Sequence, residues 1–153
     1  MELFQIFTIM KDISRFLKAQ EGRFDNYQTA LQEIRNGRKV SHWIWYIFPQ
    51  VSGLGFSEMS VYYGIDSVDE ARAYLENQAL RNRLYEITRA LLEHSDKAAD
   101  SVLGHIDAMK VRSSMTLFDV LLPNDVFAEV LDKFYGGKRC DKTLDIISRQ
   151  YHP

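Results

Sequence analysis

The feature that most constrains the fold is a recurring pattern in which a polar capping residue precedes apolar residues spaced three and four apart. Ser67 and Glu70 have the spacing of a capping box, and Asn77 precedes a segment whose apolar positions include Leu80 and Leu84. In such segments the cap satisfies free backbone N–H groups, and the apolar residues form one buried face of a helix. We therefore expect an all-α protein, a single compact domain of about seven or eight short amphipathic helices.

The same pattern recurs along most of the chain. Further helices are expected to begin near Asp12, at Asp25 or Asn26, near Asp96, at Asn124 and at Asp141. One long apolar stripe is predicted from Ile106, Met109, Ser113, Leu117 and Val120. Residues 40–48 differ, because apolar side chains occupy both the odd-numbered and the even-numbered positions from 43 to 48. This segment is compatible with a strand or with one buried helical turn.

The chain has 153 residues, of which 46% are hydrophobic, and this is enough for a core of its own. Residues 1–11 are predicted to be an apolar N-terminal extension, and residues 12–150 a single helical domain. The extension carries an acid, Glu2, where a signal peptide carries bases. No run approaches the roughly 20 apolar residues of a membrane span. With a single cysteine and hence no internal disulfide, we expect a soluble cytoplasmic protein.

Charge and spacing argue against several classes of function. The formal net charge is −2, from 19 basic and 21 acidic residues, so the whole chain has no strong attraction for nucleic acid or an anionic membrane. The four histidines lack the spacing of known metal motifs, so no metal site is expected. Glycines 53, 55 and 64 do not form a dinucleotide-binding fingerprint, and no cofactor is predicted.

The most unusual segment is 37–50, which contains both tryptophans of the chain. Its candidate ligand-binding residues are Lys39, His42, Trp43, Trp45 and Gln50. Aromatic rings can stack on a planar ligand while a few polar groups orient it, so these residues predict a pocket. The alternative interpretation is that the rings only pack in the core, because large aromatic side chains supply much of the packing in a domain of this size.

A second candidate cluster lies at 105–116. Asp107 and Lys110 are the candidate catalytic residues, and Ser113, Ser114 and Thr116 are candidate ligand-binding residues. Helical spacing brings an acid, a base and hydroxyls to neighbouring turns, a combination that suits a ribose or a phosphate. Two alternatives remain: a surface ion pair whose neighbouring hydroxyls bond back to helix carbonyls, and a Ser–Lys nucleophile pair.

These two clusters also carry a family resemblance. The segments 37–50 and 107–118, with Phe134-x-Gly-Gly and Asp141-x-Thr143-Leu, resemble a bacterial domain-of-unknown-function family often mislabelled calpastatin. The match extends from about Asp12 to Ile147. It implies an all-helical single domain and no established activity.

Shorter stretches are similar to a second, helical family that binds ADP-ribose and cleaves its N-glycosidic linkages. They are 16–20, 80–84, Thr88 and 92–94. Two positions depart from that family: Arg15-Phe16 replaces its histidine-tyrosine pair, and Leu103-Gly104 replaces its Trp-Gly element. The likeness implies a ligand of the ADP-ribose or NAD type.

The functional hypothesis from the sequence is a pocket that binds a nucleotide-ribose ligand and hydrolyses an N-glycosidic bond. A tryptophan would stack on the base, Lys39 and Lys110 would meet phosphates, and Asp107 would position water. The alternative is a non-enzymatic helical interaction module that binds protein or RNA. In that case a basic face is expected from Arg35, Arg38, Lys39, Arg81, Arg83 and Arg89.

Overall fold

The computed structural model describes residues 12–150, which form one all-α domain, as predicted. Its helices are α2 (Ser14–Gln20), α3 (Tyr27–Arg35), α4 (Ile44–Ile47), α5 (Glu58–Tyr63), α6 (Val68–Glu76), α7 (Gln78–Leu92), α8 (Ala99–Leu103), α9 (His105–Leu121), α10 (Val126–Tyr135) and α11 (Asp141–Gln150). Extended pairing within these residues is limited to one parallel bridge, between Val51 and Ile65. The predicted apolar extension, residues 1–11, lies outside the described residues.

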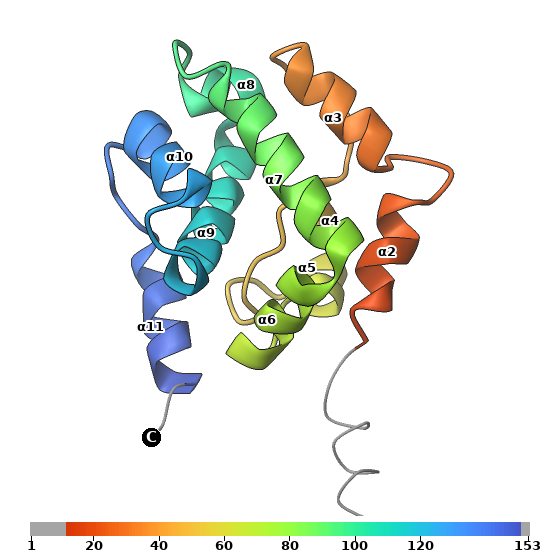
Figure 1. The fold of residues 1–153 in the computed structure, drawn as a ribbon, viewed down its shortest axis with the longest axis vertical. Coiled ribbons are helices and arrows are strands. Elements are labelled where there is room, and N and C mark those ends of the chain that lie inside the picture. The colour runs from red at the N-terminus through yellow and green to blue at the C-terminus, as the bar shows by residue number, and fades with distance from the viewer. Residues whose placement is uncertain (1–11, 151–153) are drawn as a thin grey trace, which may run out of the picture.

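The helices pack around α7 and α9. In Figure 1, α7 crosses the front of the molecule, with α3 on one side and α10 on the other, and it packs against both. Helix α9 packs against α8, α10 and α11, and the short α4 packs against α2, α5 and α9. This arrangement places the aromatic segment around α4 beside the polar segment at the beginning of α9.

A series of aromatic rings runs through the core and connects most of these helices. Phe16 of α2 meets Tyr74 of α6 at a centroid distance of 5.1 Å, and Tyr74 meets Phe118 of α9 at 5.7 Å. Phe118 then meets Phe127 of α10 at 5.7 Å, and Phe127 meets Tyr85 of α7 at 5.3 Å. Contacts between aromatic rings stabilise a fold by more than the burial of their apolar surface. This series of rings therefore holds five helices in one core.

Several predicted helix caps are confirmed and others are corrected: near Asp12 and Asp96, the helices α2 and α8 begin after Ile13 and Ala98, without a side-chain cap. The side chains of Asn26, Ser67 and Asn77 each accept a hydrogen bond from the backbone N–H three residues later. Asn124 was predicted to cap α10, but the cap is Asp125, whose carboxylate accepts from the N–H of Val126. Asn124 instead has φ +60°, a left-handed conformation that asparagine tolerates in turns and that a capping residue does not use.

The apolar stripe predicted for α9 is partly wrong. Ile106, Met109 and Val120 are exposed, with relative accessibilities of 68%, 53% and 39%. The buried face includes Val111 and Met115 instead. Because α8, α10 and α11 pack around this helix, small and polar residues are buried as well, and the apolar periodicity of the sequence alone does not mark the core face.

The ambiguous segment 40–48 contains one helical turn, α4, and no strand. Trp43 precedes α4 without a side-chain cap, and Ser41 bonds to Glu33 instead of capping the turn. Helix α5 was not predicted, although Ser57 caps it by accepting from the N–H of Ser60 at 3.1 Å. These two short helices bring the number within residues 12–150 above the predicted seven or eight.

Candidate functional site

Glu33 of α3 organises the chain that leads into α4. One carboxylate oxygen, Oε1, accepts from the N–H groups of Val40 (2.7 Å) and Ser41 (2.8 Å) and from Trp43 Nε1 (2.9 Å). The other, Oε2, accepts from the Ser41 hydroxyl at 2.6 Å. Burial alone would raise the pKa of Glu33, but these hydrogen bonds outweigh it and hold the pKa below its usual value. The ionised carboxylate therefore fixes both ends of the 40–43 turn.

Two lysines share Asp107 beside this turn. Lys39 Nζ lies 2.8 Å from Asp107 Oδ2, and Lys110 Nζ lies 3.1 Å from Asp107 Oδ1. Each ammonium group also lies over an indole ring: Lys39 is 4.9 Å from the centroid of Trp43, and Lys110 is 4.2 Å from that of Trp45. The two segments singled out in the sequence therefore meet in one cluster of charge and aromatic surface.

The two lysines differ in how far they reach solvent. Burial would raise the pKa of Asp107, but hydrogen bonds from Lys39 and Lys110 lower it below its ordinary value. Asp107 is therefore an anion at neutral pH, shared by the two lysines. Lys39 is nearly buried, and it also donates to the carbonyl of Ser41. Lys110 is the more accessible of the two cations, with 22% of its side chain exposed.

A pocket of about 210 Å³ opens next to Lys110. Its lining residues come from α4, α5, α9 and the chain between α4 and α5: Trp45, Gln50, Val51, Leu54, Gly55, Ser60, Tyr63, Gly64 and Lys110. Aromatic and aliphatic side chains form most of its wall, and Gln50, Ser60 and Lys110 supply side-chain polar groups. Mainly apolar walls with a few convergent polar groups are typical of small-molecule sites.

Backbone pairing holds the two sides of the pocket together. Ile65 N–H donates to the carbonyl of Gln50 at 2.8 Å, and Ser52 N–H donates to the carbonyl of Ile65 at 2.9 Å. Gly64 fits this crossing because it has no side chain. A Cβ there would collide with the side chain of Ser52 across the crossing and would lie 3.0 Å from its Cα atom. The glycine thus permits the close approach that forms this wall.

The predicted site residues occupy three different environments. Trp45, Gln50 and Lys110 line the pocket, and Lys39 and Asp107 lie directly behind Lys110. Trp43, Ser113, Ser114 and Thr116 are in the interior, and His42 is exposed. The structure therefore brings together five of the ten predicted residues.

The buried hydroxyls have structural contacts of their own. Ser113 bonds to Thr143 of α11 at 2.7 Å. Thr116 donates to the carbonyl of Arg112 at 2.8 Å and accepts from the N–H of Cys140 at 3.0 Å. Ser114 Oγ is buried without a hydrogen-bonding partner among the described residues. These contacts hold α11 and its preceding loop on α9, and none of them forms a Ser–Lys pair.

Sequence reasoning missed the pocket residues that follow Gln50. Leu54, Gly55, Ser60, Tyr63 and Gly64 were not candidates, because the glycines were tested only against a dinucleotide fingerprint. The available signal was Ser57, a capping residue that begins α5 and places Ser60 and Tyr63 one turn apart on one face.

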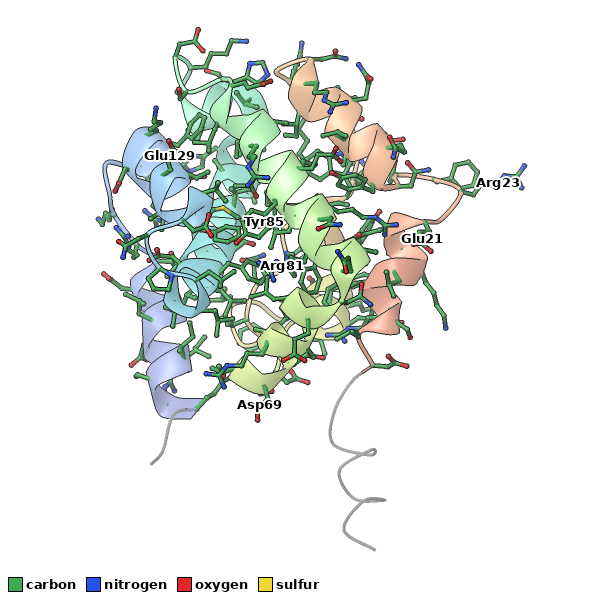
Figure 2. All side chains as sticks on the ribbon, in the orientation of Figure 1. Glu21, Arg23, Asp69, Arg81, Tyr85 and Glu129 are labelled. Carbon is green, nitrogen blue, oxygen red and sulfur yellow. The ribbon has the colours of Figure 1, made fainter. Side chains whose placement is uncertain are left out.

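A larger hollow of about 730 Å³ lies between α6, α7 and the end of α9. It is open and is lined largely by charged and amide side chains, including Arg72, Glu76 and Arg81. Next to it, Tyr85 lies on the side of α7 that faces α10 (Figure 2), where its hydroxyl donates to Asp125 at 2.7 Å. None of the predicted site residues contributes to this hollow, so it is a weaker candidate for a small ligand.

The basic face considered in the sequence is divided among separate contacts. Lys39 pairs with Asp107, and Arg83 Nη2 pairs with Glu21 Oε2 at 2.8 Å. Arg81 and Arg89 lie over the ring of Tyr85. The described residues contain no group of three or more metal-ligating side chains that could hold a metal ion. In the same part of the chain, no helix has both the length and the hydropathy needed to span a membrane.

Comparison with known proteins agrees with this fold. The family model described as "Protein of unknown function (DUF1810)" matches residues 10–147. The crystal structure of the conserved hypothetical protein Rv1873 from Mycobacterium tuberculosis, at 1.38 Å, is similar with a TM-score of 0.85 and 38% sequence identity. The alignment covers 90% of this chain and 96% of that chain. No curated protein matches this chain. The predicted resemblance to an uncharacterised helical family is thus confirmed, and the chain belongs to the DUF1810 family.

Proposed function

We propose that this protein binds a small organic anion with a ring-shaped body, of the nucleotide-ribose class, in the pocket beside Trp45 and Lys110. The observation that carries the proposal is the unused hydrogen-bonding capacity of that pocket. Within residues 12–150, the Gln50 amide and the Ser60 hydroxyl have no hydrogen-bonding partner, and Lys110 Nζ uses one of its three donors on Asp107. Polar side chains that make no bond within the protein and line an apolar cavity are available to a ligand.

The charge of the pocket lining sets the charge of the ligand. Among the described residues that line the pocket, Lys110 is the one with a charged side chain, so an anionic group that reaches it forms an ion pair. A phosphate or carboxylate can accept the free donors of Lys110 as charge-assisted hydrogen bonds, which are stronger than neutral ones. Trp45, Tyr63 and Val51 then contact the apolar face of the ring.

The size of the pocket limits how much of a nucleotide it holds. Its 210 Å³ is below the roughly 300–1,000 Å³ of sites for drug-sized ligands. One ring system fits, and the rest of a molecule such as ADP-ribose extends outside. The sequence predicted phosphate contacts at both Lys39 and Lys110. Because Lys39 is nearly buried, we propose a phosphate contact at Lys110 alone.

The geometry favours binding over hydrolysis. Hydrolysis of an N-glycosidic bond requires Asp107 to hold a water molecule beside the bond. Both oxygens of Asp107 already accept from lysines, and Asp107 is not among the residues that line the pocket. We therefore propose a binding protein in which Asp107 positions Lys110.

The proposal is tested by titration calorimetry with AMP, ribose 5-phosphate, ADP-ribose and the neutral nucleoside adenosine. AMP should bind more tightly than adenosine, and Lys110→Met should weaken AMP binding about 10- to 100-fold, the effect of losing a charged hydrogen bond. Lys142→Met, at an exposed lysine on α11, is the matched control and should bind as the wild type does.

Two outcomes contradict the proposal. If AMP binds equally well to the wild type and to Lys110→Met, the ligand is bound elsewhere. If none of the four compounds binds, the interaction module becomes the better hypothesis, and binding of protein or RNA is tested next. Incubation of NAD and ADP-ribose with the protein, followed by chromatography, tests hydrolysis separately.

A further inference from the structure

Phe56 is a large, exposed apolar side chain that follows the pocket wall in the chain. Its relative accessibility is 96%, the highest among the exposed large hydrophobic residues of the described chain. It directly follows Leu54 and Gly55, which line the Trp45–Lys110 pocket, and consecutive Cα atoms are only about 3.8 Å apart. An isolated exposed phenylalanine needs no explanation by itself, but this one directly follows two residues of the pocket wall and is not itself part of that wall.

The segment that carries Phe56 is held at both ends and loosely in between. At one end, Ser52 N–H donates to the carbonyl of Ile65 at 2.9 Å. At the other, Ser57 caps α5. Between these anchors, residues 53–56 make no backbone hydrogen bond to any described residue. A segment with few backbone hydrogen bonds opens at a lower free energy than the helices around it.

The glycines of this segment allow it to change conformation. Gly53 has φ +99°, which side-chain-bearing residues rarely adopt, and Gly55 follows two residues later. Glycine accepts a wide range of backbone angles, so rotation at these positions can redirect Phe56 without disturbing Ser52 or α5. The hydrogen bonds at both anchors would stay intact during such a movement.

From these observations, we propose that Phe56 is a ligand-contact residue: segment 53–56 folds over the occupied pocket, and the Phe56 ring covers the ligand. This inference rests on the function proposed above. A ligand in the pocket would provide the apolar surface on which the exposed ring of Phe56 is buried. The ring also supplies cover for a ligand that is too large for 210 Å³ alone.

The test compares two phenylalanine substitutions. Phe56→Ala should weaken AMP binding about tenfold, mainly through faster dissociation, because loss of a covering group shortens the lifetime of a complex. Phe56→Leu should restore part of the affinity. Phe24→Ala is the matched control, since Phe24 is 79% exposed in the turn between α2 and α3, where no neighbouring residue of the chain lines the pocket. All three variants should unfold at the wild-type temperature without ligand, because the rings they alter are largely exposed.

A fluorescence measurement distinguishes a Phe56 ring that covers the ligand from one that affects ligand binding at a distance. Trp43 is fully buried and Trp45 is not, so quenching of tryptophan fluorescence by acrylamide reports mainly on Trp45. AMP should protect Trp45 in the wild type and in Phe24→Ala, and protect it less in Phe56→Ala. If Phe56→Ala binds AMP and protects Trp45 as the wild type does, coverage by Phe56 is wrong and the proposed function stands. If the wild type binds none of the four compounds, both proposals fail.

Discussion

At the scale of single residues, one carboxylate decides the conformation of the turn before α4. Glu33 receives four hydrogen bonds from Val40, Ser41 and Trp43, all more than five residues away in the sequence. The spacing of residues 37–50 indicates an aromatic cluster, but it cannot show which acid fixes it. The contact depends on α3 packing beside the turn.

The Glu33 carboxylate should make stability depend on pH. Its folded-state pKa lies below the unfolded value of about 4.3, so its stabilisation is present above that pH and is lost as the pH falls through the folded pKa. Glu33→Gln should lower the free energy of unfolding at pH 7 by about 1–2 kcal/mol and reduce the loss of stability on acidification. Urea unfolding from pH 3 to pH 7 measures both effects.

The matched control for this prediction is Glu58→Gln, at an exposed carboxylate in the first turn of α5. It should keep the wild-type dependence on pH. An unchanged acid profile in Glu33→Gln would show that the turn is held by packing of Trp43 instead of by the carboxylate.

At the scale of elements, a buried ion pair holds three helices together beside the pocket. Arg15 of α2 bonds to Glu70 of α6 at 2.9 Å, and also to the carbonyls of Tyr62 and Gly64 at 2.9 and 3.1 Å. Glu70 was predicted to complete the capping box with Ser67. Its side chain accepts instead from the N–H of Asp66, one residue before Ser67, and from Arg15, so the local bond is shifted by one residue and a tertiary contact is added.

Arg15→Met should destabilise the protein by about 3–5 kcal/mol, because it leaves the Glu70 carboxylate buried and without its cation. The double variant Arg15→Met with Glu70→Leu should recover part of that loss. Both are measured by urea unfolding. Arg72→Met is the control: its pair with Asp69 is exposed, so the expected change is below about 0.5 kcal/mol.

The stability of the two arginine variants also tests whether Arg15 holds the helices beside the pocket. If Arg15→Met and Arg72→Met change stability equally, the guanidinium does not hold α5 and α6 in place. In a folded Arg15→Met variant we also expect weaker AMP binding, because the carbonyls of Tyr62 and Gly64, next to the pocket wall, lose their donor.

At the scale of the whole molecule, a single core predicts a single unfolding transition. The aromatic series from Phe16 to Tyr85 links five helices, so no group of helices has a separate core. Scanning calorimetry should show one peak with equal calorimetric and van't Hoff enthalpies, near 100 kcal/mol for a domain of this length at about 60 °C. Two peaks, or a van't Hoff enthalpy well below the calorimetric one, would contradict a single cooperative core.

The sequence by itself determined the properties that depend on local interactions. Capping side chains and apolar spacing predicted the all-α class, and Asn26, Ser67 and Asn77 cap where expected, because a cap contacts only the backbone of its own first turn. The sequence also identified Trp45, Gln50 and Lys110 as chemically unusual, and these residues line the pocket.

Only the tertiary structure decided which of the unusual residues share a site. Trp43 and Ser113 were candidates for the same site as Trp45 and Lys110, yet the first two are buried, with hydrogen bonds to Glu33 and Thr143. The other wall of the pocket comes from residues 51–64, which meet Lys110 only because α9 packs against the chain around α4. Burial and partner choice arise from contacts between distant segments, which local spacing does not encode.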